Sequence, residues 1–83
     1  MNGCGLYIRF KNNLAVGGEG IRVGRFKIPH HLIEEFSEAE RSVKLYRDWK
    51  LYEKNGEFII SYHQLTIRID ASEVLCIQTR PFQ

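Results

Sequence analysis

The chain has few of the residues that mark secreted, membrane-spanning or disordered proteins. Its 83 residues include only two cysteines and two prolines. No apolar run approaches the length of about 18 residues that a transmembrane helix needs. A basic start followed by a long apolar segment, the pattern of a secretory signal peptide, is also missing. With 43% hydrophobic and 27% charged residues, the composition is typical of a globular protein, and we expect a single small domain over residues 1–83.

The two cysteines, Cys4 and Cys76, lie near opposite ends of the sequence. They could form a disulfide if the first and last strands were neighbours, but a secreted disulfide framework usually has more cysteines. Two reduced thiols in a cytoplasmic protein are therefore favoured. Cys76 belongs to the apolar run at 74–77 and is interpreted as a small core residue.

The motifs of common catalytic and metal sites are missing from the sequence. Its serines are scattered and none lies in the elbow that presents a nucleophile. The glycine-rich run at 17–20 is not followed by the Lys-Ser or Lys-Thr of a phosphate-binding loop. His30, His31 and His63, even with Cys4, lack the ligand spacing of a zinc site. We therefore expect no enzymatic activity, no metal and no cofactor.

The strongest structural signal is the Asn55-Gly56 pair between two alternating apolar runs. Asn-Gly is typical of a two-residue type I′ turn, because both central residues need φ > 0. Such a turn fixes six cross-strand pairs: Lys54 with Glu57, Glu53 with Phe58, Tyr52 with Ile59, Leu51 with Ile60, Lys50 with Ser61 and Trp49 with Tyr62. Alternation then makes one face apolar and the other polar. Tyr52 and Ile59 are the apolar residues that fall on the polar face.

The residues after this hairpin predict two further strands. Residues 65–69 alternate and would pair with the second hairpin strand across a loop at His63 and Gln64, placing Leu65, Ile67 and Ile69 on the apolar face. A polar turn of 3-10 character follows at 70–73, and the apolar run at 74–77 predicts a strand buried on both faces that ends before Pro81. This order resembles the last part of an SH3-like small barrel in architecture only.

The N-terminal half predicts two strands and a helix. Residues 5–11 alternate as a strand, residues 12–20 read as a loop, and residues 21–28 form a second strand whose phase changes at Gly24, as at a β-bulge. No internal repeat is visible. Pro29 and the apolar residues Leu32, Ile33 and Phe36 predict an amphipathic helix at about residues 30–40.

A competing pattern concerns residues 41–54. Ser37 to Glu40 matches a capping box, so a helix beginning at Glu38 and running towards Lys54 is an alternative to strands. The cross-strand match between the two sides of the Asn55-Gly56 turn favours strands. We therefore predict an α+β fold, mainly an antiparallel sheet curled towards a small SH3-like barrel, with one amphipathic helix (about 30–40) inserted after the second strand.

The favoured function is non-catalytic binding through a protein surface, with another protein or with a second copy as partner. Tyrosines are enriched in such interfaces, and apolar residues on a wet sheet face need a cover. Either the predicted helix or a partner protein could cover these apolar residues. The candidate interface consists of Tyr46, Tyr52, Ile59, Glu34, Glu35 and Glu38.

The alternative function is nucleic-acid binding through a basic and aromatic sheet face. Small barrels bind single strands by stacking bases on aromatic rings and lining the backbone path with Lys and Arg. Against this, the net charge is only +2 and the pI is about 8.7, which is below the usual range of nucleic-acid binders. The candidate residues are Tyr7, Arg9, Lys11, Arg22, Arg25 and Lys27.

Overall fold

The protein is nearly all β. The computed structural model describes residues 3–81, which form ten strands and two single-turn 3-10 helices. In chain order they are β1 (Cys4–Phe10), β2 (Ala15–Val16), β3 (Gly20–Val23), β4 (Phe26–Pro29), η1 (His30–Leu32), β5 (Ile33–Ser37), β6 (Ser42–Leu45), β7 (Lys50–Lys54), β8 (Glu57–Ser61), β9 (Thr66–Asp70), η2 (Ala71–Glu73) and β10 (Val74–Pro81). None of the helical turns in this range could cross a membrane.

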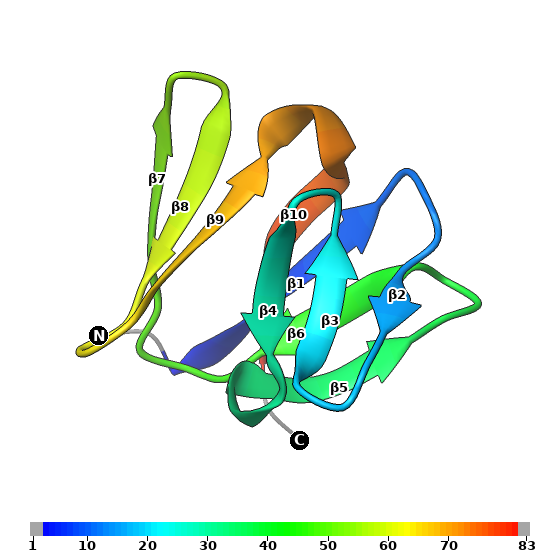
Figure 1. The fold of residues 1–83 in the computed structure, drawn as a ribbon. Coiled ribbons are helices and arrows are strands. Elements are labelled where there is room, and N and C mark those ends of the chain that lie inside the picture. The colour runs from blue at the N-terminus through cyan, green and yellow to red at the C-terminus, as the bar shows by residue number, and fades with distance from the viewer. Residues whose placement is uncertain (1–2, 82–83) are drawn as a thin grey trace.

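The strands form three small antiparallel sheets (Figure 1). Sheet A has the order β10-β1-β6-β5, sheet B the order β2-β3-β4, and sheet C the order β7-β8-β9. β4 and β9 lie near each other, which brings sheets B and C together. The sheets of the described chain do not close into a barrel, so the SH3-like barrel prediction is wrong.

The core contains side chains from all three sheets. In sheet A, Ile8 and Val43 are cross-strand partners and both are completely buried. Sheets B and C contribute equally inaccessible side chains, namely Ile21, Ile28, Ile60 and Ile69. Burying an isoleucine contributes roughly 1.5–3 kcal/mol relative to leaving it in water, so these residues stabilise the assembly of the sheets.

The amphipathic helix predicted at residues 30–40 is wrong, and with it the α+β fold class. Only His30–Leu32 are helical, as η1, and Ile33–Ser37 form β5. Leu32 is buried, but Phe36 is 43% exposed, so the helical spacing does not correspond to a buried stripe. A helix of this length is marginal in isolation, whereas β5 gains a ladder of backbone pairs with β6.

Residues 41–54 contain the strands β6 and β7 and no helix, so the alternative helix is wrong and the hairpin prediction is confirmed. β7 and β8 pair in the predicted register from Lys50–Ser61 to Lys54–Glu57. Asn55 and Gly56 both have positive φ, 54° and 77°, as the type I′ turn requires. The β8–β9 register and the 3-10 turn before β10 also follow the prediction, but Leu65 precedes β9 and is exposed, so its predicted place on the apolar face is wrong.

Two local predictions in the remaining strands are wrong. Gly24, with φ of 59°, starts a two-residue turn that reverses the chain between β3 and β4, so that Val23 pairs with Phe26 and no bulge is formed there. Glycine at the first central position is typical of such turns. The run at 74–77 is not buried on both faces, because Leu75 is 53% exposed on the edge strand β10 and Cys76 is also exposed.

The two cysteines are free thiols that lie apart on sheet A. Cys4 is opposite Pro81, and Cys76 is opposite Arg9. Although β1 and β10 are neighbours, the register therefore separates the two sulfur atoms along the strands. The two cysteines are thus not bonded to each other, and the core role predicted for Cys76 is wrong.

The fold contains two structural repeats. The first repeat, residues 4–37, and the second repeat, residues 42–81, each consist of one strand, a three-stranded meander, a 3-10 turn and a final strand. The final strand of each repeat pairs with the first strand of the other, β5 with β6 and β10 with β1. β1 and β6 also pair with each other. Every ladder of sheet A therefore joins the two repeats.

Details of the pairing support this equivalence. The β1–β10 ladder steps from Arg9–Cys76 to Phe10–Val74 across a bulge, and the β6–β5 ladder steps from Lys44–Glu35 to Leu45–Ile33 across the same irregularity. After each first strand, one amide donates to the last carbonyl of a 3-10 turn at 3.0 Å, from Lys11 to Glu73 and from Tyr46 to Leu32. An approximate twofold axis thus passes beside the Ile8–Val43 pair.

Candidate functional site

The outer face of sheet C carries the apolar pair that the hairpin register isolates. Tyr52 on β7 is opposite Ile59 on β8, and Arg68 on β9 continues the same row. The Tyr52 side chain is 54% exposed and Ile59 is half-buried. We call these three residues the outer row. No helix among residues 3–81 covers them, so the helix at 30–40 that was predicted as their cover does not have this role.

A hollow of about 320 Å³ lies beside the outer row, near the Asn55-Gly56 turn. Its lining residues are Lys54, Asn55, Glu57, Ile59 and Arg68. The wall thus combines one apolar side chain with an amide and with charged groups of both signs. Such a surface can accept a partner side chain that is apolar on one side and polar on the other.

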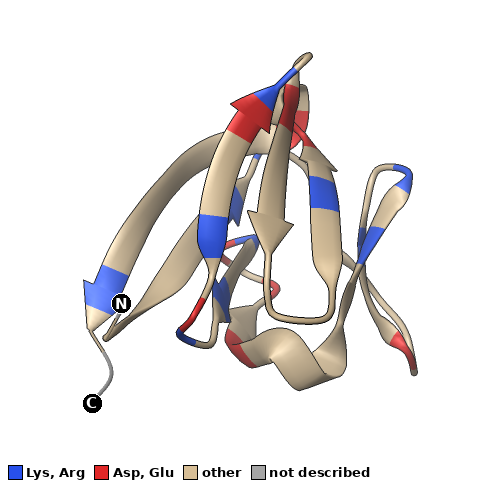
Figure 2. Cartoon of the chain, turned by 90° about the vertical axis from the view of Figure 1, so that its left-hand side faces the viewer, with Lys and Arg blue, Asp and Glu red and all other residues tan. Residues whose placement is uncertain are grey.

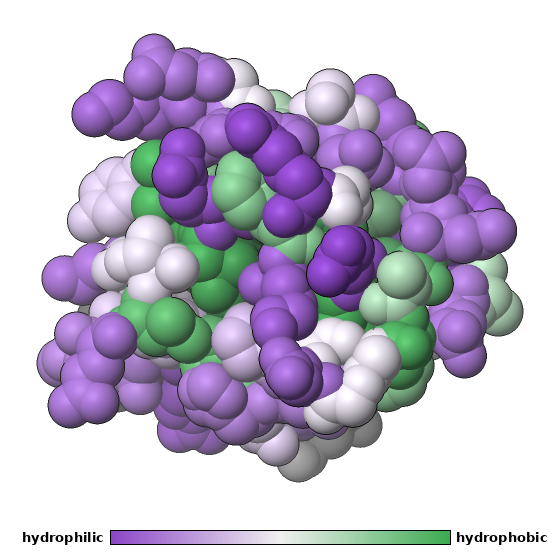
Figure 3. Space-filling model, viewed as in Figure 1, coloured by the Kyte–Doolittle hydropathy of each residue, from purple (hydrophilic) through white to green (hydrophobic). Residues whose placement is uncertain are grey.

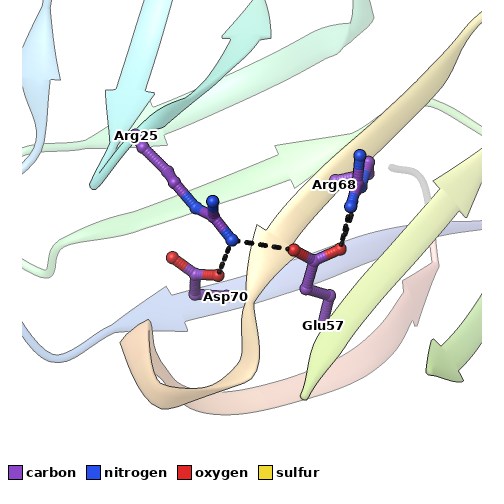
Figure 4. Close-up of polar contacts among 4 residues, drawn as sticks. All are labelled: Arg25, Glu57, Arg68 and Asp70. Carbon is purple, nitrogen blue, oxygen red and sulfur yellow. Dashed lines mark hydrogen bonds and ion pairs between the residues drawn. The ribbon is translucent and has the colours of Figure 1, made fainter. Parts of the chain in front are cut away.

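Glu57 holds the charged side of this hollow in place (Figure 4). Its Oε1 atom accepts from Arg68, with Nη2 at 2.8 Å and Nε at 2.9 Å, and its Oε2 atom lies 3.0 Å from Nη2 of Arg25. Arg25 also reaches Oδ1 of Asp70, at 3.3 Å. The Glu57 side chain is only 10% exposed. Its charge is compensated by charge-assisted hydrogen bonds, as a nearly buried carboxylate requires.

These contacts also join sheet C to sheet B. Arg25 lies in the turn between β3 and β4, whereas Glu57 and Arg68 lie on β8 and β9. Both arginines are placed over the ring of Phe26, with their guanidinium carbons 4.7 and 5.5 Å from its centroid. Arg68 is therefore held from two sides, and the end of the outer row is preorganised for contact with a partner.

The other predicted interface residues lie elsewhere. Glu34 and Glu35 are on β5, and Glu38 is in the turn before β6. Glu34 forms an ion pair with Lys44 at 3.2 Å within sheet A. In Figure 1, β5 lies at the bottom of the view and β7 at the upper left. The structure therefore separates these glutamates from Tyr52 and Ile59, and they do not form one surface.

Tyr46 lies in a third place, immediately after β6. Its ring is exposed, while its carbonyl accepts a hydrogen bond of 2.7 Å from the Tyr62 hydroxyl. Burial, with a smaller contribution from the negative charge of Asp48, raises the pKa of Tyr62 to about 12. A hollow of about 240 Å³ lies here, lined by Asp48, Lys50, Ser61, Tyr62 and His63. Tyr62 remains a neutral hydrogen-bond donor at physiological pH.

The predicted basic face is divided between two sheets. Tyr7 and Arg9 lie on β1 of sheet A, whereas Arg22 and Lys27 lie on sheet B. Tyr7 is nearly buried, because the guanidinium carbon of Arg80 lies 3.7 Å from its ring centroid. A base could not stack on this ring without displacing Arg80. Lys11 is exposed in the segment that follows β1.

Several of these cations already have partners within the chain. Lys27 forms an ion pair with Glu19 at 2.8 Å, and its hydrogen bond and positive charge lower the pKa of Glu19. Arg9 donates to the Glu40 carbonyl at 3.2 Å. Figure 2 shows basic and acidic segments interspersed along the ribbon. A hollow of about 450 Å³ beside Arg22 and Lys27 also has Glu19 in its wall.

The histidines likewise do not converge. Nε2 of His30 lies 2.6 Å from the Gly17 carbonyl, which connects η1 to the glycine-rich loop, whereas His63 lies near Tyr62. Within residues 3–81, no group of three or more His, Cys, Asp and Glu side chains is placed to hold a metal ion.

Sequence reasoning found the centre of the outer row but missed the residues that support it. It interpreted Glu57 as the partner of Lys54 across the turn, whereas the Glu57 side chain bonds to Arg25 and Arg68. The signal for Arg68 was available, since the β8–β9 register places it beside Ile59. The signal for Arg25 was not, because the contact joins residues from different sheets.

Apolar residues reach the surface in more than one place. On the face shown in Figure 3, apolar residues appear in separate areas between polar and charged ones. Among the described residues, exposed large apolar side chains also include Phe36 and Leu75 on sheet A. Phe36 is opposite the completely buried Val43, whereas Tyr52 is opposite the half-buried Ile59, which lines the charged hollow. Comparisons of the chain with protein-family models, with curated proteins and with solved structures find no match.

Proposed function

We propose that the protein is a non-catalytic binding module whose contact site is the outer row of sheet C. The observation that carries the proposal is the Tyr52–Ile59 pair on the face turned away from the core, in which Tyr52 is exposed and Ile59 is half-buried. Ordering an exposed tyrosine beside a branched apolar side chain creates contact area at a low cost in conformational entropy. The free thiols support a cytoplasmic location.

The surroundings of the pair support a partner of defined chemistry. Lys54 lines the neighbouring hollow, and Arg68 lies at the end of the row. Glu57 is already bonded to two arginines, so its charge is largely compensated. A protein segment that places an apolar side chain on Tyr52 and Ile59 and a carboxylate towards Lys54 would complement this surface.

Nucleic-acid binding has less support. Its candidate residues lie on two sheets, the Tyr7 ring is covered by Arg80, and Lys27 is bonded to Glu19. A contiguous basic path with accessible aromatic rings is what sequence-tolerant single-strand binding needs. Residues 3–81 offer no such path along the predicted residues.

A pair of double variants tests the proposed site. Tyr52→Ala with Ile59→Ser removes the apolar centre, whereas Phe36→Ala with Leu75→Ser removes an exposed aromatic and an exposed aliphatic side chain from sheet A. Each tagged protein is cross-linked in living cells, and captured proteins are quantified by mass spectrometry. We expect one set of captured proteins to fall at least tenfold in the first variant and to persist in the control.

Two results would contradict the proposal. One is an unchanged capture profile for the folded Tyr52→Ala, Ile59→Ser variant. The other is an equal loss in both double variants, which would indicate a general effect of surface polarity. Circular dichroism of both variants establishes that they are folded before capture is compared.

A further inference from the structure

Sheet A is assembled only from contacts between the two repeats. β1 pairs with β6 and β10, both of which belong to the second repeat, and β6 pairs with β1 and β5, both from the first. Neither repeat can form a ladder of this sheet from its own strands. Each repeat therefore needs the complementary repeat as its partner, wherever that partner comes from.

One short turn connects the repeats within the chain. β5 ends at Ser37 and β6 begins at Ser42, and these two residues are opposite each other in the ladder. In between, Arg41 has φ of 56°, a left-handed conformation that a non-glycine residue adopts only with strain. The turn is stabilised locally by the Arg41 amide, which donates to the Glu38 carbonyl at 3.3 Å. Short strained hinges favour exchange of domains between copies.

We propose that a second copy of this chain can take the place of the missing repeat, giving a strand-exchanged dimer. The turn at 38–41 opens into an extended connection, so that β5 and β6 of one copy become continuous. Residues 4–37 of each copy then assemble with residues 42–81 of the other. All three ladders of sheet A form again with the same registers, and Arg41 leaves its left-handed conformation.

The closed monomer and the exchanged dimer differ mainly at this turn. In the monomer the repeats meet at the high effective concentration set by a short connection. The dimer is therefore favoured by high protein concentration and by changes that prevent the turn from closing. Exchange does not use Tyr52 or Ile59, so it is independent of the proposed binding site. It would place two copies of that site in one particle.

An engineered disulfide distinguishes exchange from ordinary surface association. Arg9 and Cys76 are cross-strand partners in the β1–β10 ladder, a spacing that permits a disulfide. In an Arg9→Cys, Cys4→Ser variant, oxidation joins residues 9 and 76. The bond lies within one chain in the monomer and between two chains in the exchanged dimer. Denaturing gels without reductant then separate covalent dimers from single chains.

Hinge variants shift the equilibrium in opposite directions. Deleting Glu38, Ala39 and Glu40 leaves one residue between Ser37 and Ser42, whereas a closed antiparallel turn needs at least about two. Inserting two glycines after Ala39 is the matched control, because it lets the turn close without strain. Light scattering after size exclusion should show mainly dimer for the deletion and mainly monomer for the insertion.

The combined outcomes decide the proposal. The Arg9→Cys and Cys4→Ser changes are introduced into the deletion variant, and its dimer fraction is oxidised. If this fraction runs as a covalent dimer, the result supports exchange. Dimers that run as single chains, or a folded deletion variant that remains monomeric, overturn it. If the deletion prevents folding, the same cysteine variant with the natural turn is refolded at high concentration. A cross-linked dimer then supports exchange, and monomer alone overturns it.

Discussion

The two three-stranded meanders share a framework but present different outer surfaces. Counting back from the 3-10 turns, the buried Ile28 of sheet B corresponds to Ile69 of sheet C, and Ile21 corresponds to Phe58. The same alignment puts the pair Ala15–Arg22 where sheet C has Tyr52–Ile59. At these inner positions both repeats hold large apolar side chains, whereas the corresponding outer pairs differ in polarity.

The meanders also differ in length. β2 has two residues and β7 has five. The turn between β3 and β4 consists of Gly24 and Arg25, whereas residues 62–65 connect β8 to β9. The β7–β8 hairpin of sheet C projects from the body of the molecule (Figure 1). Projection makes the outer row accessible without exposing the core beneath sheet A.

The largest effect on stability should follow from truncating a core side chain where the two repeats pair. Ile8→Ala leaves a cavity beside the approximate twofold axis and should lower the free energy of unfolding by about 2–5 kcal/mol. Val43→Ala should cost less, because valine buries roughly one methylene fewer. Circular dichroism and Trp49 fluorescence should report the same denaturant midpoint in both variants. Separate midpoints would mean that the repeats unfold independently and that the ladders of sheet A do not couple them.

A smaller effect on the free energy of unfolding is expected at a position where the repeats differ in charge. Glu57 on sheet C corresponds to Gly20 on sheet B. Glu57→Ala should lower the free energy of unfolding by about 1–2 kcal/mol, since Arg68 loses its carboxylate partner and Arg25 keeps only Asp70, but both arginines can return to water. Urea denaturation measures the stability of both this variant and Glu57→Gln, which is the control of matched shape. Wild-type stability of Glu57→Ala would show that the bridge between sheets B and C is not stabilising.

Tyr62, in the longer turn of sheet C, should make the stability of the fold depend on pH. The Tyr62 pKa of about 12 lies above its ordinary value of 10.0, so the folded protein retains a proton that the unfolded chain releases. This stabilisation is complete below pH 10 and is lost as the pH rises towards 12. The urea midpoint should therefore fall more steeply over that interval for wild type than for Tyr62→Phe. Parallel curves would show that burial of Tyr62 does not raise its pKa in the folded protein.

The smallest change in stability should come from copying the outer row onto the first repeat. Ala15→Tyr with Arg22→Ile recreates the apolar pair on sheet B and should alter the free energy of unfolding by no more than about 0.5 kcal/mol. Added to Tyr52→Ala, Ile59→Ser, it should not restore partner capture, because sheet B has Gly20 in the place of Glu57. Restored capture would show that the pair alone is sufficient.

The sequence predicted those parts of the fold that depend on neighbouring residues. The Asn55-Gly56 turn sets the β7–β8 register locally, and the outer position of Tyr52 and Ile59 follows from alternation. The helix at 30–40 failed because its apolar spacing covers little more than one turn, and the pairing of β5 with β6 outweighed that preference.

The repeats and the charged bridge could not be predicted from one sequence. Equivalent core positions hold similar side chains, such as Ile28 and Ile69, but Leu32 corresponds to Glu73 and the meanders differ in length. Likewise, the contact between Arg25 and Glu57 depends on how two sheets meet. No local pattern specifies that distance, since it results from packing of the shared core.

The strands of sheet A are not synthesised on the ribosome in the order in which they pair. β1 is made first, yet both of its neighbours, β6 and β10, belong to the later half of the described chain. At roughly 5–20 residues per second, the apolar side chains of β1 wait several seconds for β10 to emerge. Molecular chaperones that bind extended apolar segments therefore have their clearest opportunity at Leu6, Ile8 and Phe10, before the final strand covers the edge of the first.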